Sequence, residues 1–121
     1  MVHLIDWVGL DIKAPWDKYE LLSGRPNMAE KVKQSIGVLQ EAGIAFEART
    51  TCDPRYLTLK DIERLTDDLR TMNVSHYAMQ KYRMFDGDKN PPNVSDIEAF
   101  FCNAEWVNGI REKFQSFLTR E

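Results

Sequence analysis

The sequence predicts an α/β protein built on a parallel sheet, because short β-forming segments alternate with amphipathic helical segments. The β-forming segments are residues 8–14, 44–51 and 75–83, and helical periodicity separates them at residues 27–43 and 58–73. Strand, helix, strand, helix, strand at this spacing is typical of parallel strands joined by crossover helices. Such crossovers are right-handed, so we expect both helices to cover the same face of the sheet.

Polar and apolar residues alternate along the first two predicted strands, as a strand with one buried face requires. In the first strand the apolar face comprises Val8, Leu10, Ile12 and Ala14, and the other face comprises Trp7, Gly9, Asp11 and Lys13. In the second strand the apolar face comprises Ile44, Phe46, Ala48 and Thr50, and the other face comprises Glu47, Arg49 and Thr51. Both strands therefore direct charged side chains to one side of the sheet.

Local signals set the expected ends of the two crossover helices. Asn27 can cap the first helix, with Glu30 in the capping-box position, and Gly43 is placed to end it. Thr58 begins the second helix and Asn73 can close it.

Residues 84–121 have a different character. The segment "MFDGDKNPPN" contains an Asp-Gly turn and a proline pair, which predict a loop. Ser95 and Glu98 have the spacing of a capping box before a helix. That helix has a stripe made of Trp106, Val107, Ile110 and Phe114. The last segment, "FQSFLTRE", is compatible with a continued helix or a short strand, and its β-compatible Phe117 and Leu118 slightly favour the strand.

The composition predicts a cytoplasmic protein and narrows its partners. A net charge of −3 without any basic run gives no footprint for nucleic acid. No uncharged apolar stretch is long enough to cross a membrane, and the start "MVHLIDW" does not have the features of a secretory signal. Cys52 and Cys102 are expected to be free thiols, and neither they nor His3 and His76 are assigned to a metal.

Polar side chains recur near the carboxyl end of every predicted strand. They are Asp11 and Lys13, Arg49 and Thr51, and Gln80 with Arg83. In parallel α/β folds, ligands bind beyond these ends because the loops that follow the strands converge there. The sequence therefore predicts a polar cleft at that edge. The alternative is that Asp11 with Lys13, like Glu47 with Arg49, forms a partly exposed structural ion pair worth under ~1 kcal/mol.

Several segments, in order, resemble the C-terminal half of radical S-adenosylmethionine (SAM) proteins. They are "DWVGLDIKAP", "KYELLSG", "SIGVLQEAGIAFEARTT", "LTLKDIERL" and "YAMQKYR", and they extend from Asp6 to Arg83. The resemblance is strongest to the activating enzymes of glycyl radical enzymes, particularly anaerobic ribonucleoside-triphosphate reductase activating proteins and pyruvate formate-lyase activating enzyme. Asp-x-Lys alone is a weak signal. Its combination with Glu-x-Arg-Thr-Thr and Met-Gln-x-Tyr-Arg, each one βα unit apart, is more specific.

The resemblance implies a partial (β/α)6 barrel of the TIM-like type. This chain would be its C-terminal half, with three βα units of parallel strands followed by a C-terminal helical tail. Residues 1–121 would then be a single incomplete domain, with half-barrel strands and helices at 6–83 and a loop and C-terminal helix packing on them at 84–121. In that family a [4Fe–4S] cluster binds SAM and cleaves it reductively, and the 5′-deoxyadenosyl radical removes a hydrogen atom from a glycine of the partner enzyme.

The resemblance also implies cofactor contacts for five residues, and it assigns no catalytic residue to this chain. Lys13 would pair with the carboxylate of SAM, and Asp11 would accept a hydrogen bond from its ammonium group or a ribose hydroxyl. Arg49 and Thr51 would lie beside the cofactor on the next strand, and Gln80 would face the same cavity from the strand after it.

One departure from the family pattern changes the expected activity. The cluster motif Cys-x3-Cys-x2-Cys is absent from this sequence. Three thiolates hold such a cluster while one iron stays open for SAM, and Cys52 and Cys102 provide neither the number nor the spacing. The sequence thus predicts a C-terminal fragment of a radical SAM activating enzyme that is inactive alone, the cluster belonging to the full-length protein.

Two other interpretations remain open: a non-catalytic α/β relic or interaction module, and an unrelated α/β fragment that binds a small anionic ligand. The resemblance implies a glycyl radical enzyme as the protein partner. The exposed edge of the strand at residues 8–14 is expected either to pair with a missing N-terminal half or to self-associate, because unpaired apolar edge strands tend to associate.

Overall fold

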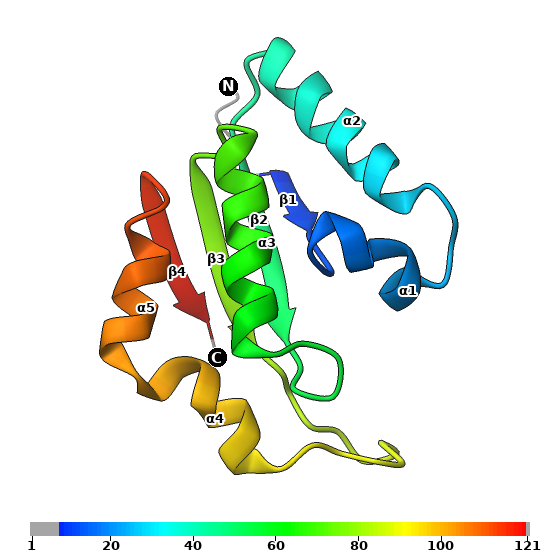
Figure 1. Ribbon diagram of the computed structural model, residues 1–121, viewed down its shortest axis with the longest axis vertical. Coiled ribbons are helices and arrows are strands. Elements are labelled where there is room, and N and C mark those ends of the chain that lie inside the picture. Colours follow the sequence, from blue (N-terminus) through cyan, green and yellow to red (C-terminus); the bar gives the residue numbers. More distant parts are fainter. Residues whose placement is uncertain (1–7, 121) are drawn as a thin grey trace, which may run out of the picture.

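The computed structural model describes residues 8–120, and its centre is a four-stranded sheet whose strands are all parallel. The strands are β1 (Val8–Asp11), β2 (Phe46–Cys52), β3 (His76–Lys81) and β4 (Ser116–Arg120), and they lie side by side in chain order (Figure 1). The predicted α/β class and parallel strands are confirmed. The interpretations given for His3 and Trp7 lie outside the described residues.

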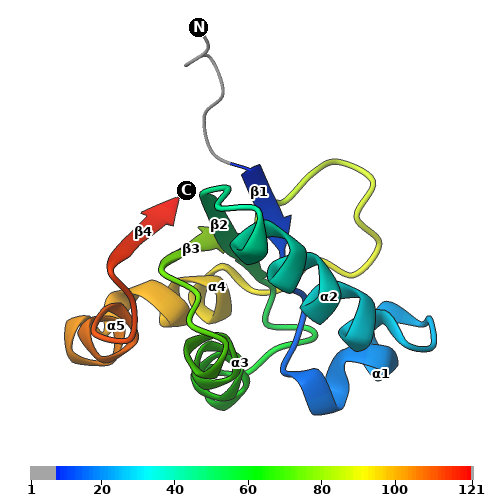
Figure 2. The same cartoon turned by 90° about the horizontal axis from the view of Figure 1, so that it is seen from above.

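The helices lie together on one face of the sheet, and its other face is free of helices (Figure 2). They are α1 (Tyr19–Ser23), which follows the 3-10 turn η1 (Trp16–Lys18), α2 (Met28–Glu41), α3 (Leu59–Thr71), α4 (Val94–Cys102) and α5 (Ala104–Arg111). This one-sided arrangement is the one expected for right-handed crossovers between neighbouring parallel strands. None of the helices within residues 8–120 is long and apolar enough to cross a membrane.

The core lies between the sheet and the helices, where the apolar face of the strands packs against the apolar faces of the helices. Ala48 and Met79 of the sheet are fully buried, as are Ile36 of α2 and Leu65 and Leu69 of α3. Truncating a leucine in such a position costs about 2–5 kcal/mol, because a cavity is left in close-packed surroundings. Apolar burial on the helical side thus fixes the sheet, which leaves the opposite side available for polar groups.

Strand β1 ends at Asp11 and is shorter than predicted, because the chain leaves β2 after Ile12. Ile12 N still donates to Arg49 O at 2.8 Å, but Lys13 N donates to the hydroxyl of Tyr19 at 3.2 Å. Pro15 has no N–H to offer, and the chain turns away into η1. Asp11 and Lys13 consequently lie at the point where the strand leaves the sheet.

The helix ends agree with three of the predicted signals. Thr58 forms a capping box with Asp61 at the start of α3. Gly43 and Asn73 follow α2 and α3 with positive φ angles, 70° for Gly43 and 62° for Asn73. This left-handed conformation ends many helices.

Two predicted capping boxes are wrong. Asn27 precedes α2, but its φ of 61° is left-handed rather than extended, and its side chain makes no capping bond. A capping residue normally has an extended backbone, so Asn27 and Glu30 do not form a capping box. Helix α4 begins one residue before Ser95, after Asn93, and Glu98 instead pairs with Lys81 at 2.7 Å.

The tail after β3 contains a fourth strand in addition to helices. Asn103 separates α4 from α5 and accepts a hydrogen bond from Trp106 N at 3.1 Å. Residues 116–120 then pair with β3 as β4. The ring centroid of buried Phe117 lies 6.2 Å from the ring centroid of Tyr77. The expectation of a helical tail is therefore wrong for these last residues, and the preference for a short last strand is confirmed.

Candidate functional site

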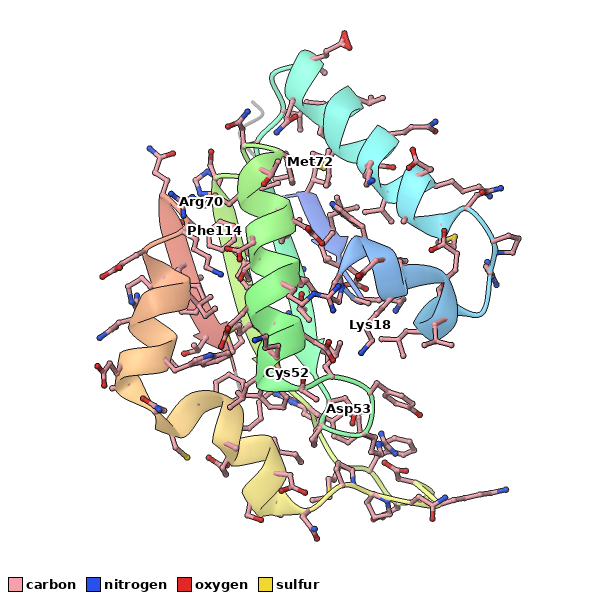
Figure 3. The ribbon with its side chains drawn as sticks, in the orientation of Figure 1. Lys18, Cys52, Asp53, Arg70, Met72 and Phe114 are labelled. Atoms are coloured by element: carbon pink, nitrogen blue, oxygen red, sulfur yellow. The ribbon has the colours of Figure 1, made fainter. Side chains whose placement is uncertain are left out.

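A pocket of about 300 Å³ opens at the carboxyl ends of β1 and β2. Its lining residues come from these ends and the loops that follow them: Asp11, Ile12, Lys13, Leu22, Arg49, Thr51, Asp53, Tyr56, Leu57 and Tyr82. Figure 3 shows Cys52 and Asp53 at this edge of the molecule, and Arg70 and Met72 at the opposite end of α3. The pocket thus occupies the edge at which parallel α/β folds bind their ligands.

The structure brings the five sequence-predicted site residues to this edge. Asp11, Lys13, Arg49 and Thr51 line the pocket. Gln80 lies beside it, because its Oε1 accepts a hydrogen bond from Thr51 Oγ1 at 3.4 Å. Their proximity is a structural fact, and their role in binding a ligand stays a prediction.

Tyr19 holds the end of β1 in place. Its side chain is buried, and its hydroxyl accepts from Lys13 N at 3.2 Å while donating to Asp11 O at 3.4 Å. Burial raises the pKa of this hydroxyl, the hydrogen bond from Lys13 N opposes that rise, and the charge of Asp11 adds to it. The phenol therefore stays neutral at physiological pH and can both donate and accept.

The side chain of Arg49 is bound by the buried carboxylate of Glu47. Its Nε donates to Glu47 Oε1 at 2.8 Å, and Glu47 is 3% exposed. Arg120 of β4 reaches the same carboxylate, with Nη1 2.6 Å from Oε1. Burial alone would raise the pKa of Glu47, but the hydrogen bonds from Arg120 and Arg49 outweigh it and lower the pKa below the usual glutamate value.

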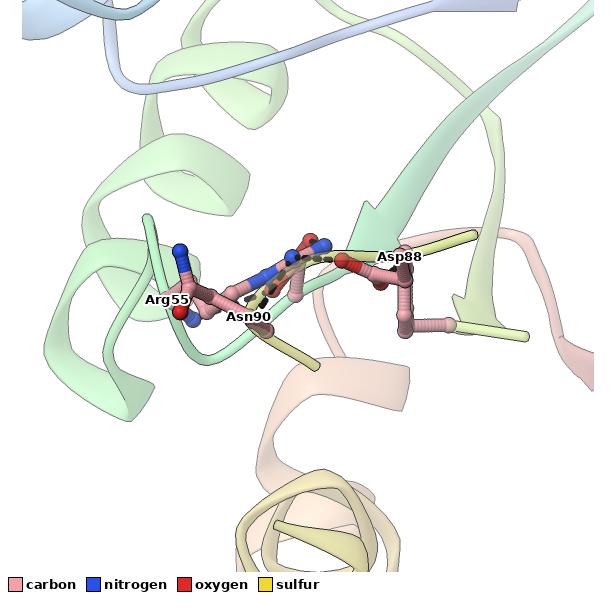
Figure 4. A network of polar contacts seen from close by, with 5 residues as sticks. Arg55, Asp88 and Asn90 are labelled. Carbon is pink, nitrogen blue, oxygen red and sulfur yellow. Dashed lines mark hydrogen bonds and ion pairs between the residues drawn. The ribbon is translucent and has the colours of Figure 1, made fainter. Parts of the chain in front are cut away.

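A second polar network, here called the rim network, includes Asp53 and Tyr82 of the pocket lining. Figure 4 shows its contacts around Arg55. The guanidinium of Arg55 donates to Asp53 through Nε and Nη2, at 3.0 and 2.7 Å, and Nη1 donates to Asp88 at 2.9 Å. Nη1 also donates to Asn90 O at 3.0 Å, and the hydroxyl of Tyr82 donates to Asp88. The loop after β3 is thereby tied to the loop after β2.

The protonation states of this rim network follow from its hydrogen bonds. The hydrogen bond from Tyr82 lowers the pKa of Asp88, and burial partly opposes this effect. The same bond raises the pKa of the Tyr82 hydroxyl. The hydrogen bond to Asp53 raises the pKa of Arg55 still further above its usual range. The network thus holds one cation between two anions. The sequence signal for it is the short polar run "DPRY" directly after β2.

The thiols of the chain do not fit an iron–sulfur cluster. Cys52 is fully buried, and burial raises the pKa of its thiol to about 12. A cluster ligand, by contrast, must be a thiolate. Cys102 is exposed at the end of α4 and donates to Glu98 O. Within residues 8–120, no group of three or more His, Cys, Asp or Glu side chains could hold a metal ion.

Taken together, the fold and the pocket define an α/β protein with a mixed-charge site at the carboxyl edge of a parallel sheet. A protein of Methanocaldococcus jannaschii described as "Putative glycyl-radical enzyme activating enzyme MJ1227" is 30% identical over 83 residues, which cover 65% of this chain and 34% of that relative. This similarity supports a relationship to the activating enzymes of glycyl radical enzymes, and the chain spans about a third of the relative's length. No family model and no solved structure matches the chain.

Proposed function

We propose that this chain forms one wall of the SAM site of a radical SAM activating enzyme that generates a glycyl radical on a partner protein. The observation that carries the proposal is the pocket at the carboxyl ends of β1 and β2, which is lined by Asp11, Lys13, Arg49 and Thr51. The similarity to a protein described as an activating enzyme supports the same class. In this proposal the sheet is the C-terminal half of a partial (β/α)6 barrel, and residues 1–121 form one incomplete domain.

The charges of the pocket suit the zwitterionic end of SAM. Lys13 and Arg49 offer positive charge to its carboxylate, and Asp11 offers an acceptor to its ammonium group or to a ribose hydroxyl. Tyr56 and Tyr82 add ring surfaces that suit a flat base such as adenine. The pocket volume of about 300 Å³ is small. It lies at the lower end of the range for ligand pockets, as expected when only one wall is present.

The cluster that would cleave SAM is not held by these residues. The whole sequence contains two cysteines, and the buried Cys52 thiol has a pKa unsuited to coordination. In our proposal a segment outside this chain supplies the cluster, and the chain alone binds SAM without cleaving it. A bound cluster would supply the electron for reductive cleavage, and this chain's residues would orient the substrate.

The free edge of β1 is the place where such a segment would dock. β1 is an edge strand that pairs with β2 in register from Val8 with Phe46 to Asp11 with Arg49. Unpaired strand edges favour association, so we expect the isolated chain to self-associate through β1 unless the segment that supplies the cluster covers it. A single monomeric species in light scattering at high concentration would contradict this part of the proposal.

Calorimetric titration of the chain with SAM tests the proposed site. Lys13→Ala removes one charge-assisted hydrogen bond, worth roughly 1.5 kcal/mol, so we expect about tenfold weaker binding. Lys31→Ala is the matched control, since Lys31 is an exposed lysine of α2 away from the pocket, and it should bind SAM as the wild type does.

Two outcomes would overturn the proposal in different ways. If inorganic phosphate binds and competes as strongly as SAM, the pocket is a general anion site, as in the unrelated α/β interpretation. If wild type and Lys13→Ala bind SAM equally, the pocket is not where SAM binds.

A further inference from the structure

The buried carboxylate of Glu47 is shared unequally between two arginines that come from different strands. Arg120 binds both of its oxygens, with Nη1 2.6 Å from Oε1 and Nη2 3.2 Å from Oε2. Arg49 binds only Oε1, and only through Nε at 2.8 Å. The side chain of Glu47 is 4% exposed, so these contacts are largely shielded from water. A planar guanidinium can bind a carboxylate bidentately, and here Arg120 takes that arrangement.

The strand register explains how Arg120 reaches Glu47 across an intervening strand. Arg120 is paired with Gln80 of β3, and Arg49 of β2 is paired with Ala78 of β3. Residues 78 and 80 share one face of β3, and position 78 carries only a methyl group. A larger side chain there would occupy the path between Arg120 and Glu47. Ala78 is nevertheless fully buried, which agrees with long side chains lying over it.

The backbone of strand β1 at Gly9 lies close to the guanidinium of Arg49. A Cβ at position 9 would lie 2.4 Å from Nη1 of Arg49 and 2.6 Å from its Cζ. Glycine in a strand often marks such a close approach of another group to the backbone. The guanidinium of Arg49 therefore lies against Gly9, and its Nε donates to Glu47. Arg49 is also one of the residues that line the pocket. Within residues 8–120, the bond to Glu47 is the one hydrogen bond of this side chain.

We propose that Arg120 and Glu47 are positioning residues for Arg49. The bidentate contact of Arg120 engages both oxygens of Glu47, so Arg49 is anchored through Nε alone and its terminal nitrogens remain available to the carboxylate of the ligand. The last strand of the chain is thereby part of the site although it lines no wall of the pocket. Without Arg120, Glu47 is free to bind Arg49 bidentately and to neutralise its charge. The identity of the ligand rests on the proposed function, whereas the arrangement of the three side chains does not.

Nuclear magnetic resonance of the Arg49 Nε–Hε group tests the arrangement without any ligand. Arg120→Ala should shift this resonance and weaken SAM binding at least threefold. Arg120→Lys restores the charge but not the bidentate contact, so it should fall between Arg120→Ala and the wild type in both measurements. Arg70→Ala removes an exposed arginine at the opposite end of α3 and should change neither. If Arg120→Ala does not fold, Arg120→Gln, which keeps part of the side-chain stem, carries the same test.

Each result decides one of the two claims. An unchanged Nε–Hε resonance in Arg120→Ala overturns the positioning role, whatever the affinity for SAM. A shifted resonance in a chain that binds no SAM upholds the positioning role and removes the proposed ligand. Wild-type behaviour of Arg120→Lys in both measurements would show that charge alone suffices and would overturn the bidentate mechanism.

Discussion

Gly9→Ala should weaken ligand binding with little change in stability, because the three atoms nearest to the added Cβ all belong to the side chain of Arg49. The added Cβ would lie 2.4 Å from Arg49 Nη1. The guanidinium must therefore retreat by about 1 Å to reach ordinary contact. The bond from Arg49 Nε to Glu47 is now 2.8 Å long. A retreat of that size would lengthen or break this bond and displace the terminal nitrogens of Arg49. We expect SAM to bind about tenfold more weakly, the loss of one charge-assisted contact.

The free energy of unfolding of Gly9→Ala should change less than its SAM affinity, because two effects of similar size on stability oppose each other. Replacing glycine by alanine in a strand stabilises by about 0.5–1 kcal/mol through the unfolded chain. Losing the contact of Glu47 with the partly exposed Arg49 costs about 1 kcal/mol, since Arg120 still binds the carboxylate. Urea unfolding should thus give a free energy of unfolding within ~1 kcal/mol of the wild type.

Gly37→Ala is the matched control for this variant. Gly37 lies in α2, and a Cβ there would meet no atom within 4 Å. We expect it to stabilise the chain by about 0.5–1 kcal/mol and to leave SAM binding unchanged. If Gly9→Ala binds SAM with wild-type affinity, the packing of Arg49 against Gly9 does not position Arg49 for the ligand. A loss of several kcal/mol in stability would show that the added methyl group meets something less yielding than a side chain.

Three further predictions follow from the buried and bridged groups. Because the pKa of Glu47 is lowered in the folded state, its contribution to stability is present above about pH 4.5 and is lost as the pH falls; urea unfolding at several pH values should show Glu47→Gln with a weaker dependence over that range. A thiol reagent at neutral pH should modify exposed Cys102 in the folded chain and reach Cys52 only in denaturant, because burial raises the pKa of the Cys52 thiol to about 12; rapid modification of both would contradict its burial. Arg55→Ala should free the loop after β3 from the loop after β2, which limited proteolysis would detect as faster cleavage near Asp88, and unchanged cleavage would show that Tyr82 alone holds the loop.

Periodicity predicted α2, α3 and the first three strands, because each has a local pattern, but it did not predict α1 or the division between α4 and α5. The alternation around Ile12 predicted the first strand, and the helical periodicity of residues 58–73 predicted α3. The caps were less predictable, because a capping pattern such as Asn27 with Glu30 requires an extended backbone that the preceding turn does not provide. The last strand was ambiguous in the sequence, and its pairing with β3 decides the matter through contacts such as that of Phe117 with Tyr77.

The position of the candidate pocket residues was predictable as far as strand direction determines it. Spacing two apart placed Asp11 with Lys13, and parallel strands placed Arg49 near them. The contact of Arg120 with Glu47 joins residues 73 positions apart, and no local pattern indicates it. The rim network around Arg55 likewise depends on how two loops meet, so it emerges only from the tertiary structure.

The most direct test of the account is the amide resonance spectrum of the isotope-labelled chain during titration with SAM. We predict saturable shifts concentrated at residues 11–13 and 49–53, with the region around Asn73 at the opposite edge of the sheet unchanged. An absence of shifts at millimolar SAM, or shifts centred on the opposite edge, would contradict the proposal that this chain forms a wall of a SAM site.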